Sequence, residues 1–396
     1  MSKNMNVPKL RFSEFGGEWE EKKLGDYGKL INGLTYSPDN IIDDGLLVLR
    51  SSNIQNDQIS FHDNVYVDLE VKEEYITREN DILICVRNGS KRLIGKSILI
   101  SNELPRATHG AFMTVFRGDS NKLISHWFKS VIFYKEVHKN LGATINSING
   151  SDLKKFKIIL PPKQEQEKIA SFLTSVDTKI EQLTKKETLL QEYKKGVMNK
   201  IFNQEIRFKD DDGSEFPEWE EKKLGDITKI IMGQSPSSDS YNLDNNGIPL
   251  IQGNADIQNR LTNPRNYTTE KTKECKVEDL ILTVRAPVGA VAKSIHNACI
   301  GRGVCAIRSN KESVNEFIYQ FLLNYETKWS SLEQGSTFTA VSGLEIKKLK
   351  LNLPSLKEQT KIANFLSSID KKIELTTKEL NSTKEFKKAL LQQMFV

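Results

Sequence analysis

The nine-residue sequence EWEEKKLGD occurs twice in this chain, at Glu18–Asp26 and at Glu218–Asp226. A perfect repeat of this length rarely arises by chance, so it indicates an internal duplication. A duplication restricts the possible folds more than any other feature of the sequence, because both halves of the chain must be built on one framework.

The repeat extends over nearly the whole chain. Upstream, LRF at Leu10–Phe12 matches IRF at Ile206–Phe208. Downstream, the matching segments keep the same order: Asp81–Arg87 with Asp279–Arg285, 142–145 (GATI) with 335–338 (GSTF), and Pro161–Ile169 with Pro354–Ile362. From the last pair onwards the alignment continues without a gap. The chain is therefore a tandem duplication with similar ends and divergent middles.

Length and composition are those of a soluble protein with two domains. The chain has 396 residues, of which 38% are hydrophobic and 28% charged, and its length is enough for two domains. No apolar run approaches the roughly 18 residues that a membrane span needs, and the N-terminus lacks the apolar core of a signal peptide. The four cysteines form no CxxC pair, which favours a reducing cytoplasm over disulfides or zinc. A net charge of +5 permits a nucleic-acid partner without requiring one.

Each repeat is expected to contain a mixed domain followed by a long helix. Short apolar runs separated by turn-forming residues are strand signals, and they occur at Leu46–Leu49, Ile82–Val86 and Ile98–Ile100. Each domain is also predicted to contain one helix, at Ile124–Asn140 and Val314–Glu333. An exit strand that ends at proline follows, at Lys154–Leu160 and Lys347–Leu353. The long helices are predicted at Gln164–Phe202 and Glu358–Phe395.

These elements divide the chain into framework segments, domains and helices. In chain order they are an N-terminal framework segment, a first domain, a central helix, a linker, a second domain and a C-terminal helix: 1–18, 19–160, 161–203, 204–218, 219–353 and 354–396. Trp19 and Trp219, with Leu24 and Leu224, are expected to anchor the first strand of each domain. The Arg-Phe segments are expected to pack near helix ends. Because the N-terminal segment resembles the linker, the repeat order suggests a pseudo-circular arrangement of the chain.

Both long helices carry a narrow apolar seam at alternating spacings of three and four, which is typical of coiled coils. The seam residues are Ile169, Leu173, Val176, Ile180 and Leu183 in the first helix and Ile362, Leu366, Ile369, Ile373 and Leu380 in the second. Glu187 and Lys194 interrupt the first seam. Two matched seams favour antiparallel pairing over the alternative, in which each helix lies only on its own domain. About 38 paired residues would form a rod of roughly 55 Å, or about 16 base pairs of DNA.

The sequence contains no recognisable catalytic or cofactor motif. Asn88–Ser97 resembles a phosphate-binding loop, but five residues separate Gly89 from Gly95 where a P-loop has four. A loose metal-nuclease pattern at Asp39 is lost in the second repeat, where Ser237 replaces the acid. The histidines are scattered. We therefore expect no catalytic residues, no metal site and no cofactor.

Polar and cationic side chains that suit nucleic acid follow the predicted strands. Arginine and lysine pair with guanine edges in the major groove, and asparagine and glutamine pair with adenine edges. The candidate DNA-binding residues are Arg50, Asn53, Arg87, Asn88, Lys91 and Arg92 in the first domain and Gln252, Asn254, Arg285 and Arg302 in the second. An exposed arginine on such a surface is more often only a solvated charge, so the prediction rests on the grouping of these residues after matched strands.

The order of motifs is the same in both halves: Arg-Phe, Trp-Glu-x-x-Lys-Leu-Gly-Asp, a variable domain, Gly-x-Thr, Pro-x-x-x-Glu-Gln-x-x-Ile and a heptad helix. This order resembles the DNA-specificity subunit of type I restriction-modification systems, and the resemblance covers almost the whole chain. Its most specific part is the entry into each helix, present as Pro161, Glu165 and Gln166 and again as Pro354, Glu358 and Gln359.

The resemblance implies both a fold and a function. The implied fold is α+β, with two target recognition domains in a pseudo-twofold tandem repeat, separated by long helices paired as an antiparallel coiled coil. Each domain would read one half of an asymmetric, split site in double-stranded DNA. The helices would set the gap and dock two methyltransferase subunits, to which the restriction (nuclease-translocase) subunits add. The chain itself would not be an enzyme.

Two other classes of function stay open on the residues alone. One is a coiled-coil scaffold that binds only protein, which salt-dependent retention on DNA would distinguish from a DNA reader. The other is a stand-alone DNA-modifying enzyme, which a cofactor-binding assay on the pure chain would reveal.

Overall fold

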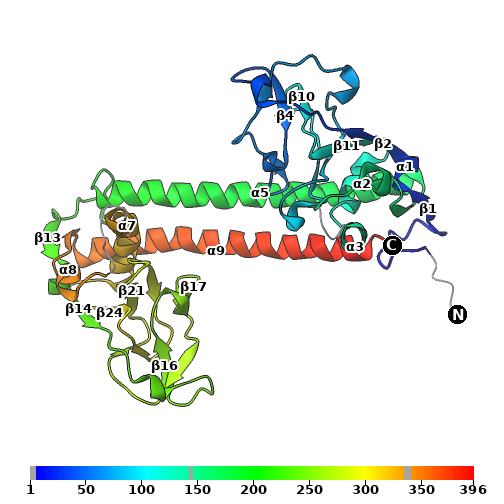
Figure 1. The fold of residues 1–396 in the computed structure, drawn as a ribbon. Helices are drawn as coiled ribbons and strands as arrows, with labels where there is room; N and C mark the ends of the chain where they lie inside the picture. The colour runs from blue at the N-terminus through cyan, green and yellow to red at the C-terminus, as the bar shows by residue number, and fades with distance from the viewer. Residues whose placement is uncertain (1–5, 142–145, 334–339) are drawn as a thin grey trace. The chain divides into compact units, whose positions relative to one another are not determined.

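The computed structural model describes residues 6–141, 146–333 and 340–396. The GATI and GSTF segments of the repeat lie outside these residues. The chain divides into two compact units, the first made of Met1–Thr184 with Lys378–Val396 and the second of Lys185–Thr377. The two long helices, α5 (Lys163–Phe202) and α9 (Leu356–Gln393), agree with the predicted ones, and each contributes to both units (Figure 1). Within the described residues, no helix is long and apolar enough to span a membrane.

The mixed domain of the first unit is built from small β-sheets. Its strands are β2 (Gly28–Asn32), β3 (Ile41–Ile42), β4 (Leu46–Leu49), β5 (Ile54–Gln55), β6 (Gln58–Ile59), β7 (Tyr66–Val67), β8 (Ile82–Cys85), β9 (Ser97–Leu99), β10 (Ala107–His109) and β11 (Met113–Gly118). One sheet has the order β10-β4-β7-β3, another has the order β2-β11-β8-β9, and β5 and β6 form a hairpin. The three predicted strands correspond to β4, β8 and β9. Of all these strand pairs, only β4 and β10 are parallel.

The mixed domain of the second unit repeats this plan with larger sheets. Its strands are β14 (Thr228–Met232), β15 (Tyr241–Asn242), β16 (Ile248–Ile251), β17 (Ile257–Gln258), β18 (Leu261–Thr262), β19 (Asn266–Thr268), β20 (Glu274–Cys275), β21 (Leu280–Thr283), β22 (Val291–Lys293), β23 (Ala298–Ile300) and β24 (Val304–Ser309). The sheet orders are β14-β24-β21-β22-β18-β17 and β15-β19-β16-β23-β20. β16 and β23 are parallel neighbours, as β4 and β10 are in the first unit.

The EWEEKKLGD repeat forms the strand that closes each domain against its own exit. The strands of the repeat are β1 (Glu20–Lys23) and β13 (Glu220–Lys223), and the exit strands are β12 (Lys157–Leu160) and β25 (Lys350–Leu353). Each pair is antiparallel. Short helices follow the repeat strands, α1 (Leu24–Tyr27) and α6 (Leu224–Ile227). Leu24, Leu224 and Trp19 are buried in their cores, which confirms their predicted anchoring, whereas Trp219 is only half-buried.

Both exit strands begin later than predicted. The expected starts, Lys154 and Lys347, lie at the ends of short helices, α4 (Gly150–Leu153) and α8 (Gly343–Lys347). In the second unit the helix is set by a capping box, because the Ser342 side chain accepts from the Glu345 N–H and Glu345 accepts from the Ser342 N–H. This capping box lies in a segment that is otherwise rich in apolar and basic residues, the composition from which a strand is predicted.

The helix predicted at Ile124–Asn140 is two helices, α2 (Asn121–Trp127) and α3 (Val131–Asn140). Ser130 caps the second helix through its hydroxyl, which accepts from the Phe133 N–H at 3.3 Å. The break turns the chain so that Phe128 and Phe133 pack edge to face, with ring centroids 4.6 Å apart. The other predicted helix is confirmed as α7 (Asn315–Glu333).

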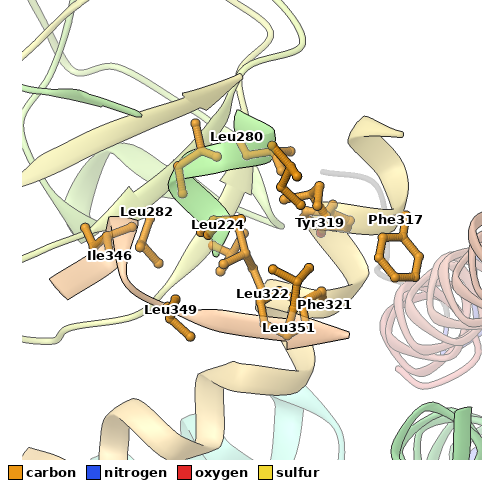
Figure 2. Packing of buried hydrophobic residues seen from close by; sticks show 14 of the residues in the cluster. Leu224, Leu280, Leu282, Phe317, Tyr319, Phe321, Leu322, Ile346, Leu349 and Leu351 are labelled. Carbon is orange, nitrogen blue, oxygen red and sulfur yellow. The ribbon is translucent and has the colours of Figure 1, made fainter. Parts of the chain in front are cut away.

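Each domain shares a hydrophobic core with the long helices. In the first unit the aromatic residues of α2 and α3 pack with the start of α5 and with the last turns of α9. In the second unit the core joins α7 and the sheet to the end of α5 and the start of α9. Figure 2 shows part of this second core, with labelled side chains from the sheet and the surrounding helices: Leu224, Leu280, Leu282, Phe317, Tyr319, Phe321, Leu322, Ile346, Leu349 and Leu351.

Within each unit, segments of α5 and α9 pack antiparallel. All ten seam residues are buried or half-buried. Lys194 of α5 pairs with Asp370 of α9 at 2.6 Å in the second unit, and Asp177 of α5 pairs with Lys387 of α9 in the first. These are the same two positions of the repeat with the helices exchanged. At their ends the seams also enter the domain cores, so each helix lies both on its partner helix and on a domain.

The seam interruptions are polar contacts between the helices. Lys194 is one partner of the ion pair described above, and Glu187 accepts a hydrogen bond from the Thr377 hydroxyl. Both residues that broke the apolar pattern are therefore paired across the helix interface. Polar pairs at the interface of packed helices favour one register.

The Arg-Phe segments pack against the helices as predicted. Phe12 meets Phe172 of α5 with ring centroids 5.7 Å apart, and Phe208 meets Phe365 of α9 at 5.5 Å. In the first unit the Leu10 N–H also donates to the Gln393 carbonyl at 2.9 Å. The N-terminal segment thus meets the end of α9, as the repeat order suggested.

A buried ion pair ties each framework segment to the start of a long helix. Arg11 donates two hydrogen bonds of 2.7 Å to the Glu165 carboxylate, which is 1% exposed. In the second unit Arg207 contacts both oxygens of Glu358, at 3.4 and 3.1 Å, and this carboxylate also accepts from the Trp219 indole at 3.0 Å. The glutamate of the Glu-Gln motif therefore receives the arginine of the Arg-Phe motif.

Replacing Glu165 by alanine should lower the free energy of unfolding by about 3–5 kcal/mol, because it leaves the Arg11 guanidinium without its partner in a largely buried site. Chemical denaturation of the full chain measures this change. Glu167, which is exposed two residues later on the same helix, is the matched control, and its alanine variant should change stability by less than about 0.5 kcal/mol. Equal effects from the two variants would contradict the role of the buried pair.

Candidate nucleic-acid interface

In the first domain, the predicted DNA-binding loops meet at one edge of the sheets. β4 and β10 are parallel neighbours, so the loops that follow them leave the same edge. Arg50 follows β4, and the loop from Gly110 to Phe112 follows β10. The Gly110 N–H donates to the Leu49 carbonyl at 3.0 Å, which holds the two loops together.

The loop after β8 joins this edge. The Asn88 side-chain amide donates to the Ser51 hydroxyl at 3.0 Å, which connects it to the turn after β4. The Phe112 carbonyl accepts from the N–H groups of Val86 and Arg87 at 3.0 and 3.1 Å. The Arg87 guanidinium carbon also lies 5.8 Å from the centre of the Phe112 ring, which is a cation–π contact. Three loops that are far apart in sequence therefore form one surface.

The predicted residues of this surface differ in how available they are. Arg87, Lys91 and Arg92 are exposed and Asn88 is half-buried. Arg50 is less available for DNA, because its guanidinium pairs with Asp63 of the same domain at 2.7 Å. The loops place these five residues at one end of β4 and β8.

Asn53 is a correction to the predicted set. Its side chain is fully buried, its oxygen accepts from the Arg50 N–H at 2.8 Å, and its amide donates to the Ser60 carbonyl at 3.0 Å. These bonds shape the turn that carries Arg50, so the amide cannot also reach the edge of a base. Sequence type alone did not distinguish a turn-forming asparagine from a base-reading one.

The second domain has the same edge. β16 and β23 are parallel neighbours, and the Gly301 N–H donates to the Ile251 carbonyl at 2.8 Å. Gln252 follows β16, and Arg302 follows β23. The loop after β21 joins them, because the Val284 N–H donates to the Gly303 carbonyl at 2.9 Å.

The predicted residues of the second domain lie on this edge. Asn254, Arg285 and Arg302 are exposed. Gln252 is half-buried, and its amide donates to the Tyr241 hydroxyl at 3.0 Å. Asp256 takes the structural place of Asn53, because its carboxylate is buried and accepts from the Gln252 N–H at 2.8 Å. Asp256 also pairs with Arg265 at 3.0 Å.

Two surface residues of this region were not predicted. Phe112 is 56% exposed beside Arg87, and Arg265 has a largely exposed side chain that is held by Asp256. Neither belongs to a motif, and both lie in the divergent middles of the repeat. Arg265 precedes a strand, so a search for cations that follow strands could not find it. For Phe112 the only signal was a large apolar residue directly before β11, after Gly110 and Ala111.

The described residues of the edges offer hydrogen-bonding groups and positive charge, and the cysteine at the end of β8 is not activated. Burial raises the pKa of the Cys85 thiol at the end of β8 to about 11, and that of Cys305 in β24 to about 12. Both thiols are therefore protonated at neutral pH, whereas a nucleophilic or metal-binding cysteine must be a thiolate. Among the described residues, no cluster of histidine, cysteine and acidic side chains is arranged to hold a metal ion.

Comparisons with known proteins agree with this architecture. A family model, the type I restriction modification DNA specificity domain, matches residues 16–191 and again residues 217–385. A protein of Methanocaldococcus jannaschii, described as the MjaX specificity subunit of a type I restriction enzyme, is 35% identical over 411 aligned residues, which cover 98% of this chain and 95% of the relative.

Solved structures show the same fold. The type I restriction-modification S subunit from M. genitalium superposes with a TM-score of 0.66 and 18% identity, over 98% of this chain and 99% of the other. A chain from a structure of a type I R-M system gives a TM-score of 0.56 and 21% identity, over 95% and 97%. The predicted α+β fold with two tandem recognition domains and long helices is thus confirmed. The chain belongs to the family of DNA specificity subunits of type I restriction-modification enzymes.

Proposed function

We propose that this specificity subunit reads a bipartite, asymmetric site in double-stranded DNA, with one recognition domain on each half-site. In this proposal α5 and α9 set the gap between the half-sites. The observation that carries it is the pair of edges described above, which share one backbone plan and an equivalent exposed arginine, Arg87 or Arg285, but differ in other side chains. Two domains that read different half-sites need the same backbone arrangement with different side chains at the DNA-facing positions.

The side chains of the two edges support direct reading of bases. The first edge has Arg87 and Arg92 as exposed guanidinium groups, which can form two hydrogen bonds to a guanine. The second has Arg285 and Arg302 with the amide of Asn254. These contacts with DNA remain predictions for every residue named.

We further propose that the chain acts without catalysis, in the cytoplasm, together with partner subunits. The partners would be two methyltransferase subunits and the restriction (nuclease-translocase) subunits. The buried, protonated thiols of Cys85 and Cys305 support a recognition role over covalent catalysis. All four cysteines are free, which fits a reducing compartment.

The long helices carry matched exposed aromatic residues that suit docking of two equivalent partners. Tyr193 of α5 is 55% exposed, and Phe386 of α9 is 52% exposed. They occupy the same position of the repeat, and one lies in each compact unit. Exposed aromatic residues are frequent energetic centres of protein interfaces. We assign one methyltransferase contact to each.

Serine at Tyr193 or at Phe386 should weaken binding of one methyltransferase by about 30-fold, the loss expected for an interface centre worth about 2 kcal/mol. The double variant should weaken both binding events. Stepwise titration followed by mass photometry measures the two stages. Leu344→Ser removes an apolar side chain that is 61% exposed on α8, and it should leave assembly unchanged. Normal binding by the double variant would place the docking surface elsewhere.

Alanine at Arg87 or Arg92 should impair reading of only the half-site served by the first domain. If the arginine pairs with a guanine, the loss should be about 1–3 kcal/mol with relaxed specificity at one position. If it meets only phosphate, binding should weaken on all sequences and its salt dependence should become shallower. Competition binding on duplexes with single base changes separates these cases, and unchanged affinity in both variants would remove this loop from the interface.

The register of the helix pair suggests how to test the gap. The Asp177–Lys387 and Lys194–Asp370 ion pairs lie on either side of the contact between Glu187 and Thr377. Four helix-forming residues inserted after Glu187 in α5, with four more before Thr377 in α9, would lengthen both helices and keep these partners opposite each other. The insertion adds about 6 Å and leaves the helix about 40° out of phase.

The complex with the double insertion should modify sites that have the original half-sites and a gap longer by one or two base pairs, since each base pair adds about 3.4 Å. Genome-wide mapping of methylated adenines, with the wild-type and variant subunits, measures half-sites and gap together. The same four residues placed after Asp211, in the exposed linker loop, should leave the gap unchanged. An unchanged gap in the helix variant would show that the helices do not set the distance, and an unspecific map from the wild type would overturn the proposed function.

A further inference from the structure

One pair of structurally equivalent positions in the two reading edges differs in whether it can carry a side chain. The Phe112 carbonyl accepts from the Val86 N–H, and the Gly303 carbonyl accepts from the Val284 N–H in the same way. Phe112 therefore corresponds to Gly303. A Cβ atom at Gly303 would lie 2.1 Å from the Gln252 carbonyl oxygen, so no side chain fits there. The first domain carries a large exposed side chain at a place where the second domain can carry none.

The backbone of Phe112 is fixed by hydrogen bonds, and Arg87 contacts its exposed ring. Its carbonyl accepts two backbone hydrogen bonds, and the Arg87 guanidinium lies over its ring at 5.8 Å. Single exposed apolar residues are common on protein surfaces and need no function by themselves. This one differs, because it lies between the loops of Arg87 and Arg50 at the edge formed by the parallel strands β4 and β10.

The chemistry of DNA limits what such a ring can recognise. The major-groove edges of the bases present hydrogen-bond donors and acceptors, and their one apolar group is the 5-methyl of thymine. A phenylalanine ring has no hydrogen bond to offer and makes apolar contact with that methyl. A guanidinium stacked on the ring would at the same time lie within reach of a neighbouring base pair.

We propose that Phe112 is a specificity-determining residue of the first domain and that it packs against the 5-methyl group of a thymine beside the base pair contacted by Arg87. This inference rests on the proposed function. It assigns a thymine to the first half-site and no equivalent apolar contact to the second domain.

Deoxyuridine provides the test, because it differs from thymine only by the missing methyl. The probe is a duplex with the site found by methylation mapping, bound by the complex of this chain with its methyltransferase subunits. Uracil in place of the contacted thymine should weaken wild-type binding by about fourfold, which corresponds to one buried methyl of about 0.8 kcal/mol. Phe112→Ala should weaken binding to the thymine duplex and should not distinguish thymine from uracil.

Two controls make the result specific. Phe61, another exposed phenylalanine of the first domain, should keep the full thymine preference when it is replaced by alanine. Phe112→Leu keeps an apolar contact and should retain most of the preference. A first half-site without thymine, where competition binding by the Arg87→Ala variant shows which half-site the first domain reads, would overturn the inference. So would a Phe112→Ala variant that still discriminates uracil. Either result would leave the proposed function standing, because specific binding by the wild type tests that function separately.

Discussion

The buried arginine–glutamate pair is the interaction on which the arrangement of each unit depends. Arg11 with Glu165, and Arg207 with Glu358, join a framework segment to the first turn of a long helix. A buried carboxylate is costly unless it is paired, so neither helix can begin in its place without the arginine segment. In the next residue of the motif, Gln166 and Gln359 donate to the carbonyls of Pro161 and Pro354. The same few contacts thus explain why the motifs at the domain boundaries occur twice.

The recognition domains repeat a second set of buried contacts beneath surfaces that differ. Asp81 accepts two hydrogen bonds from Arg117, and Asp279 accepts two from Arg308, so the strand before each reading loop is held alike. A close backbone approach is repeated as well: a Cβ atom at Gly33 would lie 1.9 Å from the Gly110 carbonyl oxygen, and one at Gly233 would lie 2.1 Å from the Gly301 carbonyl oxygen. The exposed residues at the ends of these strands take part neither in the aspartate–arginine pairs nor in the close glycine approaches. They can therefore differ between the domains without a cost in core packing.

The parts of the structure that follow a period or a repeated motif were predictable, and the parts set by single contacts were not. The heptads of α5 and α9 fixed both long helices to within a few residues. The division of one predicted helix into α2 and α3 depended on a cap at Ser130, and a serine is common in both helices and turns. Among the candidate residues, those that directly follow strands lie together in each domain, because the loops after parallel neighbouring strands leave the same edge. Asn53 is buried because it forms hydrogen bonds to Arg50 and Ser60 across a turn. The residue type alone does not reveal these contacts.

The antiparallel pairing of α5 with α9 follows from charge as much as from the apolar seam. A heptad seam alone permits shifts by one heptad and permits parallel as well as antiparallel pairing. The ion pairs remove this freedom, because Asp177 meets Lys387 and Lys194 meets Asp370 only in one antiparallel register. The two pairs are copies of one pair with the helices exchanged, so duplication of a single helix produced both. A helix that carries an aspartate and a lysine at these positions is complementary to its own copy in the antiparallel direction, and one sequence written twice is therefore sufficient to specify the pairing.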